Sequence, residues 1–410
     1  MISKYSFRRT GVALSVAGLA AVLGATGAAA TTEPSTGTDD AAAGEVSQPE
    51  PRVAITYDGG VQVLDAATLE VVGDHHRDGF LRVNAAGDGR HVLVTTEEGF
   101  QVLDAGSWTD GGASFAGASE LTDDVFAAEA AGHVVPHGER TVLFADGTGD
   151  ITSFAVADLR TGDGLPETRS WESEAAHHGV AIELADGTLL STIGTEDGRS
   201  GVRVLDADGA EVARSEECPG VHGEGTVEGE VAVFGCENGA LVYDGEFAKL
   251  TAPDEYGRIG NIFTTETSPV AFGDYRSDPD AEGYLLSAVA LIDAAAPELT
   301  IVALPEGAEY TFRDLARGPN DEGVVLATDG SLHLIDVTTG EVTASYAVID
   351  PWEGPVEWQN PHPALKVLDG VAYVTDPAAD SIHAVDLASG DVLVTGELEV
   401  TPNEIAVTTG

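Results

Sequence analysis

Histidines are the residues of this sequence whose type and spacing most clearly suggest chemistry. Five of the eleven lie in three phrases, GHVVPHG (His133 and His137), AHHG (His177 and His178) and VHGEG (His222). His133, His178 and His222 are separated by 45 and 44 residues. Three neutral imidazoles with a carboxylate or a water make a tetrahedral site that suits Zn²⁺, although nitrogen ligands also suit copper or nickel. A fold that repeats at the same interval would bring these three histidines together; otherwise each is an ordinary surface or core residue.

A hairpin phrase recurs eight times along the chain. A short β-branched run ends in an aspartate, and a turn and a second strand follow, as in GGVQVLDAATLEVV (59–72) and DGSLHLIDVTTGEVT (329–343). The intervals between the closing aspartates average about 46 residues, which is the length of a four-stranded propeller blade. These aspartates stand at positions 65, 104, 158, 206, 244, 293, 336 and 386. No stretch has a sustained period of 3.6 residues, so we expect few helices.

The repeats predict an all-β fold, an eight-bladed β-propeller, or a seven-bladed one if one hairpin is misassigned. Residues 52–410 would form this single domain. The first repeat opens with its second strand, so the C-terminal segment 401–409 is predicted to supply the missing innermost strand and to close the ring. Counting back from the second strand of each repeat selects equivalent positions at one mouth: the 81–83 region, His133, His178, His222, the 260–261 region, Arg313, His362 and Asn403.

The N-terminus has the pattern of a signal peptide. A basic stretch (4–9) precedes an apolar run (12–23) and three alanines (28–30) that resemble a cleavage site. The apolar run is too short to span a bilayer comfortably. We therefore expect a signal peptide at 1–30, a disordered acidic leader at 31–51, and a periplasmic or secreted protein without stable membrane insertion after cleavage.

The chain is strongly acidic, with 70 acidic against 19 basic residues and a net charge of −51. Such a surface repels nucleic acid and anionic lipid and favours cationic ligands. An acid-rich secreted surface explains the same charge, so the charge permits a cation function without requiring one. We expect a monomer that has no nucleic-acid partner.

The two cysteines, Cys218 and Cys236, bracket His222. In an exported protein a disulfide between them is the natural interpretation, and a chain-entropy argument gives it a value of about 3 kcal/mol. Metal ligation by the two cysteines is the less favoured alternative.

Two other functions fit parts of the pattern. A propeller-type hydrolase or lactonase would use the same histidine- and carboxylate-lined mouth around an open metal position, and an interaction scaffold would carry the histidines without metal. A Ser–His–Asp mechanism is disfavoured because the sequence has no GxSxG elbow, and no glycine-rich phosphate loop follows a strand. We therefore expect no catalytic residues and no enzymatic activity.

Several longer phrases, among them HVVPHGERTVLFADGTG, AHHGVA, CPGVHGEG, FGCENG and the terminal PNEIA, resemble the AztD-type zinc metallochaperones. The resemblance extends over nearly the whole chain from Arg52 to Gly410. The chain departs from the family's pattern in its leader, which lacks the histidine-rich segment that some family members have.

The resemblance implies an exported propeller that binds Zn²⁺ and hands it to the solute-binding protein of a zinc ABC transporter. It places the zinc ligands in the histidine phrases, and it makes the cysteine pair a counterpart of the family's disulfide. It leaves open which member of each close pair, His133 or His137 and His177 or His178, binds the metal beside His222.

Overall fold

The computed structural model of this protein describes residues 43–161 and 164–410. The strands in these ranges form eight antiparallel sheets of four strands and one small sheet of three. The predicted all-β chain of eight four-stranded, blade-like repeats is confirmed for this part of the chain. In the same ranges no helix has the length and apolar character needed to cross a membrane. The predicted signal peptide and the first part of the predicted leader, up to residue 42, lie outside the described residues.

Each four-stranded sheet is written here from its innermost to its outermost strand. The first consists of β35 (Ile405–Thr408), β2 (Arg52–Tyr57), β3 (Gly60–Asp65) and β4 (Val71–His76). The second consists of β5 (Arg82–Ala85), β6 (His91–Thr96), β7 (Gly99–Asp104) and β10 (Glu120–Ala127). The third consists of β11 (Ala131–His137), β12 (Arg140–Ala145), β13 (Asp150–Ala155) and β14 (Thr168–Glu172). The fourth consists of β15 (Ala181–Glu183), β16 (Leu189–Thr195), β17 (Gly198–Leu205) and β18 (Glu211–Ser215).

The remaining four sheets follow the same plan. The fifth consists of β19 (His222–Val227), β20 (Val231–Cys236), β21 (Gly239–Tyr243) and β22 (Phe247–Thr251). The sixth consists of β23 (Ile262–Phe263), β24 (Val270–Tyr275), β25 (Ala288–Asp293) and β26 (Glu298–Ala303). The seventh consists of β27 (Leu315–Arg317), β28 (Gly323–Leu326), β29 (Ser331–Ile335) and β30 (Val342–Ala347). The eighth consists of β31 (Ala364–Leu368), β32 (Val371–Asp376), β33 (Ser381–Asp386) and β34 (Val392–Glu397).

The burial of each strand reflects its place in its sheet. Central strands such as β3 and β6 are buried along nearly their whole length, whereas outer strands such as β4 and β14 alternate between exposed and half-buried residues. A strand that has a neighbouring sheet on both faces needs apolar side chains on both, while an outer strand needs them on one face only. The continuous β-branched runs of the sequence therefore become central strands.

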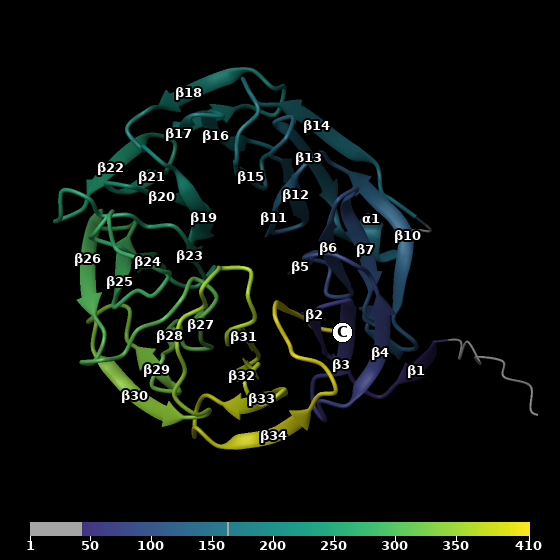
Figure 1. Ribbon diagram of the computed structural model, residues 1–410. Helices are drawn as coiled ribbons and strands as arrows, with labels where there is room; N and C mark the ends of the chain where they lie inside the picture. The colour runs from purple at the N-terminus through teal and green to yellow at the C-terminus, as the bar shows by residue number, and fades with distance from the viewer. Residues whose placement is uncertain (1–42, 162–163) are drawn as a thin grey trace, which may run out of the picture. The chain divides into compact units, whose positions relative to one another are not determined.

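The sheets follow one another in a closed series. The innermost strands lie on the inner side of the sheets in Figure 1, and those of successive sheets are in contact, for example β11 with β15, β15 with β19, and β31 with β35. The last contact joins the eighth sheet to the first, and Val53 and Ile55 share a buried cluster there with Tyr373 and Ile382. β35, near the C-terminus, pairs with β2, near the start of the series, as the repeat count predicts. The first sheet therefore contains strands from both ends of the series, and the inner edge of β2 is paired.

Six of the eight hairpin aspartates accept hydrogen bonds from the backbone of the turn that follows them. Asp65 Oδ1 accepts hydrogen bonds from the backbone N–H groups of Ala67 and Thr68, which is how an aspartate stabilises a turn. Aspartates that accept backbone bonds in the same way stand at 104, 206, 293, 336 and 386. No such bond forms at Asp244, which follows β21, within the described residues, and Asp158 lies in the short helix α1 (Val156–Thr161). That segment contains good helix formers and buries Val156 and Leu159.

The second sheet differs from the predicted hairpin. The segment after Asp104 does not continue into the outer strand but forms β8 (Ser107–Asp110) and β9 (Ala113–Ala116), and the outer strand β10 comes later. β9 pairs with β1 (Gly44–Val46), so a strand lies within the stretch 31–51 that the sequence predicts to be disordered.

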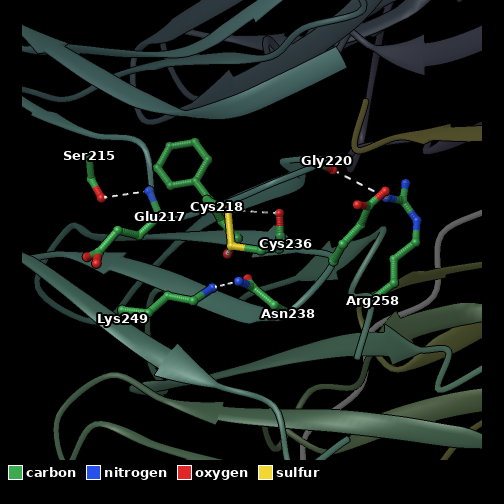
Figure 2. The surroundings of a disulfide bond; sticks show 11 residues. Ser215, Glu217, Cys218, Gly220, Cys236, Asn238, Lys249 and Arg258 are labelled. Atoms are coloured by element: carbon green, nitrogen blue, oxygen red, sulfur yellow. Dashed lines mark hydrogen bonds and ion pairs between the residues drawn. A yellow bond between two sulfur atoms is a disulfide. The ribbon is translucent and has the colours of Figure 1, made fainter. Parts of the chain in front are cut away.

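A disulfide joins Cys218 and Cys236 within the fifth sheet, as the sequence predicts. Both cysteines are buried, and the bond ties the segment before β19 to the end of β20 (Figure 2). Beside it, Arg258 Nη1 donates to the Gly220 carbonyl at 3.2 Å (Figure 2). The loop that leads into His222 is thus held on two sides.

Candidate metal centre

Three histidines converge from three neighbouring sheets. His133 lies on β11, His178 lies just before β15, and His222 begins β19. One ligand nitrogen from each lies within 4.8 Å of the others, and the ring centroids are 4.7 to 5.0 Å apart. The spacing of 44 to 45 residues in the sequence therefore corresponds to one step from sheet to sheet.

The hydrogen bonds of two of these rings fix the direction of their free nitrogens. His178 Nδ1 lies 2.5 Å from Asp146 Oδ2, and His222 Nδ1 lies 2.5 Å from the carbonyl oxygen of Gly260. Carboxylate and carbonyl oxygens only accept, so both Nδ1 atoms carry the proton and both Nε2 atoms keep a lone pair. These two Nε2 atoms face each other at 3.0 Å. Two lone pairs at that distance repel each other, and a metal ion coordinated by both nitrogens removes this repulsion.

His133 completes the set from the third side. Its Nδ1 is buried and has no hydrogen-bond partner in the described part of the chain. A buried polar atom without a partner is costly, and a metal ion would supply the missing partner. A tetrahedral zinc site with Zn–N bonds of 2.0 to 2.1 Å separates its nitrogens by about 3.3 Å, so small adjustments of these rings would fit the ion.

Burial keeps two of these imidazoles neutral. It lowers the pKa of His133 well below its ordinary value, and the neighbouring His222 lowers it further. Burial also lowers the pKa of His222 to about 3. A metal ligand must be unprotonated, so at neutral pH these two rings do not have to lose a proton before they bind a metal.

Local irregularities aim two of the rings inward. The pairing of β11 with β12 shifts register between Ala131 and His133, and that of β19 with β20 shifts between His222 and Glu224. Such bulges redirect side chains near functional sites. Gly223 has a φ of +69°, and a Cβ there would lie 2.8 Å from the carbonyl oxygen of Gly260. The position therefore needs glycine, and the same close approach brings the Gly260 carbonyl to His222.

The structure does not bring His137 or His177 to this cluster. His137 ends β11, where its Nε2 contacts Glu230 at 2.9 Å and its Nδ1 contacts Thr226 Oγ1 at 2.8 Å. His177 is buried, and its two nitrogens contact the Ala175 carbonyl and Thr192 Oγ1, both at 2.8 Å. Each ring nitrogen of both residues thus has a protein partner. Of the five candidate histidines, the arrangement favours His133, His178 and His222 as ligands.

The three histidines line one side of an inner cavity of about 750 Å³. Glu224 lines it as well, and burial raises the pKa of its carboxyl to about 7. Three neutral imidazoles beside an open space leave a fourth coordination position for water, for Glu224 or for a group from outside. That donor set can hold Zn²⁺ reversibly.

Sequence reasoning missed two groups that orient the rings, Asp146 and the Gly260 carbonyl. Asp146 lies in the phrase ADGTG, whose Asp-Gly pair predicts a turn, as the other Asp-Gly pairs of the chain do. Counting from strand to strand did select the region of Gly260, and that region lines the same cavity.

Comparison with known proteins agrees with the geometry. The chain is a homologue of the zinc chaperone AztD of Citrobacter koseri, with 28% identity over 229 residues that cover 52% of this chain and 51% of the relative. The chain thus matches about half the length of this curated relative. No protein-family model matches the chain.

Two solved structures share the fold. The structure of apo AztD from Citrobacter koseri has a TM-score of 0.73 at 21% identity and covers 88% of this chain and 98% of that one. The dihydro-heme d1 dehydrogenase NirN has a TM-score of 0.54 at 13% identity and covers 88% of this chain and 75% of its own. At these identities the likeness concerns the fold alone.

Proposed function

We propose that this protein is an extracytoplasmic zinc metallochaperone. In this proposal its eight sheets form an eight-bladed β-propeller closed by the C-terminal strand. It holds Zn²⁺ with His133, His178 and His222 and delivers it to the solute-binding protein of a zinc ABC transporter. Zinc is the cargo of this protein rather than a cofactor for chemistry. The homology to a zinc chaperone supports the choice of metal.

The observation that carries the proposal is the pair of opposed Nε2 atoms of His178 and His222, 3.0 Å apart with both Nδ1 atoms engaged elsewhere. A metal ion coordinated by both Nε2 atoms satisfies both lone pairs. Imidazole nitrogen is a preferred zinc donor, and the carboxylate of Asp146 behind His178 is the partner that zinc-binding histidines commonly have.

Delivery requires that the metal can leave. Three protein ligands leave one coordination position open to an incoming group, and the His178 side chain is 47% exposed. A partner could therefore add its own ligand first and displace this protein's histidines one at a time. The disulfide, which persists in oxidising compartments, agrees with the predicted export.

The first test is a competitive zinc titration of the metal-free protein against a chromophoric chelator. Wild type should bind one equivalent, and His222→Ala should bind at least tenfold more weakly, because a lost ligand costs more than the 10- to 100-fold that the loss of a ligand's hydrogen-bond partner costs. His76→Ala is the matched control, since the His76 side chain is 76% exposed on the outer strand β4. Unchanged stoichiometry and affinity in His222→Ala would remove His222 from the site.

The second test addresses delivery. Zinc-loaded protein is mixed with the metal-free solute-binding protein in the presence of a chelator that traps free zinc. Direct transfer should load the partner faster than zinc is released spontaneously to the chelator. If loading occurs only at the spontaneous release rate, the protein binds zinc but does not deliver it to this partner.

A metal-dependent hydrolase is the second candidate function, because the same cavity contains Glu224 with its pKa raised to about 7. Such a carboxyl can act as a general base near neutral pH. The zinc-loaded protein should then hydrolyse simple lactones or esters, and Glu224→Gln should abolish that turnover while zinc remains bound. Absence of turnover in the zinc-loaded wild type would leave the carrier function alone.

A further inference from the structure

The inner cavity that the three histidines line is also lined by basic side chains, although the protein as a whole is strongly acidic. Five of the 19 basic residues of the chain line this cavity, against three carboxylates, those of Glu224, Asp274 and Glu404. The basic residues are Arg82, Arg258, Arg276, Arg313 and Lys366. Of these carboxyl groups, that of Asp274 has a pKa raised by burial. Cations therefore outnumber ionised carboxylates here, in the reverse of the surface.

Two of these cations contact one carboxylate, and a third, Lys366, is close enough for its charge to interact with that carboxylate. Glu404 Oε1 lies 2.9 Å from Arg313 Nη2 and 3.5 Å from Arg82 Nε. Lys366, on the neighbouring β31, forms no hydrogen bond or ion pair with any residue in 43–161 or 164–410. Asp314, next to Arg313, contributes little negative charge because burial raises its pKa to about 8. Three positive charges beside one negative charge leave two positive charges uncompensated.

This cluster is built into the innermost strands rather than lying on mobile surface chains. Arg82 begins β5, Glu404 immediately precedes β35, and Lys366 lies inside β31. The side chain of Arg313 is only 4% exposed and also donates to Asn403 Oδ1 at 2.6 Å. Arg313 is paired with Glu404, whereas Arg82 is 33% exposed and Lys366 is half-buried. An excess of cations held in place on the wall of a cavity attracts an anion from outside.

Aromatic side chains supply an apolar wall beside these charges. Arg82 Cζ lies 5.8 Å from the centroid of the Trp358 ring, and Phe312 packs against the same tryptophan at 6.2 Å. Trp358 and Phe312 both line the cavity. Its volume of about 750 Å³ is in the range of small-molecule sites and exceeds what an inorganic ion would fill.

We propose that the inner cavity binds a small organic anion, a carboxylate or a phosphate ester, through Lys366, Arg82 and Arg313, with its organic body against Trp358 and Phe312. The site shares the cavity with the histidines but uses other side chains and requires no metal. It goes beyond the proposed carrier function and stands or falls independently of it.

Calorimetric titration of the metal-free protein tests the proposal, with succinate and glycerol 3-phosphate as probes and sodium chloride at matched ionic strength as the reference. One or both probes should bind saturably at one site per chain. Binding of succinate alone identifies a carboxylate site, and binding of the phosphate ester alone identifies a phosphate site. No saturable heat beyond that of sodium chloride would overturn the proposal.

The variant Lys366→Met tests whether Lys366 belongs to the proposed anion site. It removes one charge, keeps a flexible chain of similar length, and should weaken anion binding about tenfold or more, as expected for a lost charge-assisted hydrogen bond. Lys249→Met is the matched control, because Lys249 is the other lysine in the described ranges and its Nζ donates to Asn238 Oδ1 in the fifth sheet. Anion affinity that is unchanged in Lys366→Met, or reduced equally in both variants, would overturn the assignment. Zinc stoichiometry of each variant, measured separately, reports on the carrier function and on correct folding.

Discussion

Asp146→Asn tests whether the charge behind His178 tunes the zinc site. Asp146 Oδ2 contacts His178 Nδ1 at 2.5 Å, and Oδ1 accepts from the Gly179 N–H at 3.3 Å. Two acceptor oxygens are therefore used at once. An asparagine has one oxygen and one NH₂ group, so either the imidazole N–H or the Gly179 N–H loses its acceptor. In both orientations the carboxylate charge that increases the basicity of His178 is also lost.

The expected magnitude follows from the role of this contact. Loss of an outer partner of a zinc-binding histidine weakens metal binding about 10- to 100-fold, or by about 1.4 to 2.7 kcal/mol. Removing a ligand itself should have a larger effect, so the affinity of Asp146→Asn should fall between those of wild type and His222→Ala. The metal-free protein should also lose about 1 kcal/mol of stability, because one N–H group loses its acceptor beside a side chain that is only 21% exposed.

The assay is the competitive chelator titration at pH 7, with far-UV circular dichroism to confirm folding. Asp150→Asn is the control, since Asp150 is an exposed aspartate of the same hairpin whose carboxylate contacts Thr148. It removes the same charge without touching a histidine. Equal zinc affinity in Asp146→Asn and wild type would refute the assigned tautomer of His178, and equal losses in both variants would show a general charge effect instead.

Three further predictions concern residues around the site. His137→Ala and His177→Ala should keep zinc stoichiometry and affinity, because both rings have other partners; a tenfold loss in either titration would add that residue to the ligand set. Burial lowers the pKa of His362 to about 4, so between pH 6.5 and 4 the unfolded chain takes up a proton that the folded one does not. From pH 7 to pH 5 this ring should therefore cost about 2 kcal/mol of stability, and urea unfolding of His362→Asn at both pH values should show a correspondingly smaller decrease than wild type. Replacing Cys218 and Cys236 together by serine should lower the free energy of unfolding by about 3 kcal/mol through loop entropy, and a midpoint equal to that of the oxidised wild type would contradict this.

The repeat could be predicted because its signals are local. A β-branched run, an aspartate and a turn lie within about 15 residues of each other, and the same phrase recurs at blade-length intervals. The pairing of β35 with β2 could also be predicted from the sequence. The first repeat has no innermost strand of its own, so another part of the chain must supply that strand. The insertion of β8 and β9 was not, since their partner β1 lies outside the repeat.

The choice among the histidines depended on contacts that the sequence does not display. His137 is engaged by Thr226 and Glu230, which are 89 and 93 residues away. The strand period alone could not separate His133 from His137, because both lie on β11. The spacing gave the correct sheets, but the direction of each ring is set by register shifts and by distant acceptors.

The repeat also explains why one cavity is lined both by a histidine cluster and by a cluster of charged residues. Each sheet contributes one innermost strand, so the lining is a series of equivalent positions whose residue type can change without altering the clusters between sheets. Three consecutive sheets place histidines there, while others place Arg82, Arg313, Lys366 and Glu404. Substitution at these positions should therefore change what binds far more than how stably the protein folds. That separation allows each binding site to be removed in turn while the other is measured.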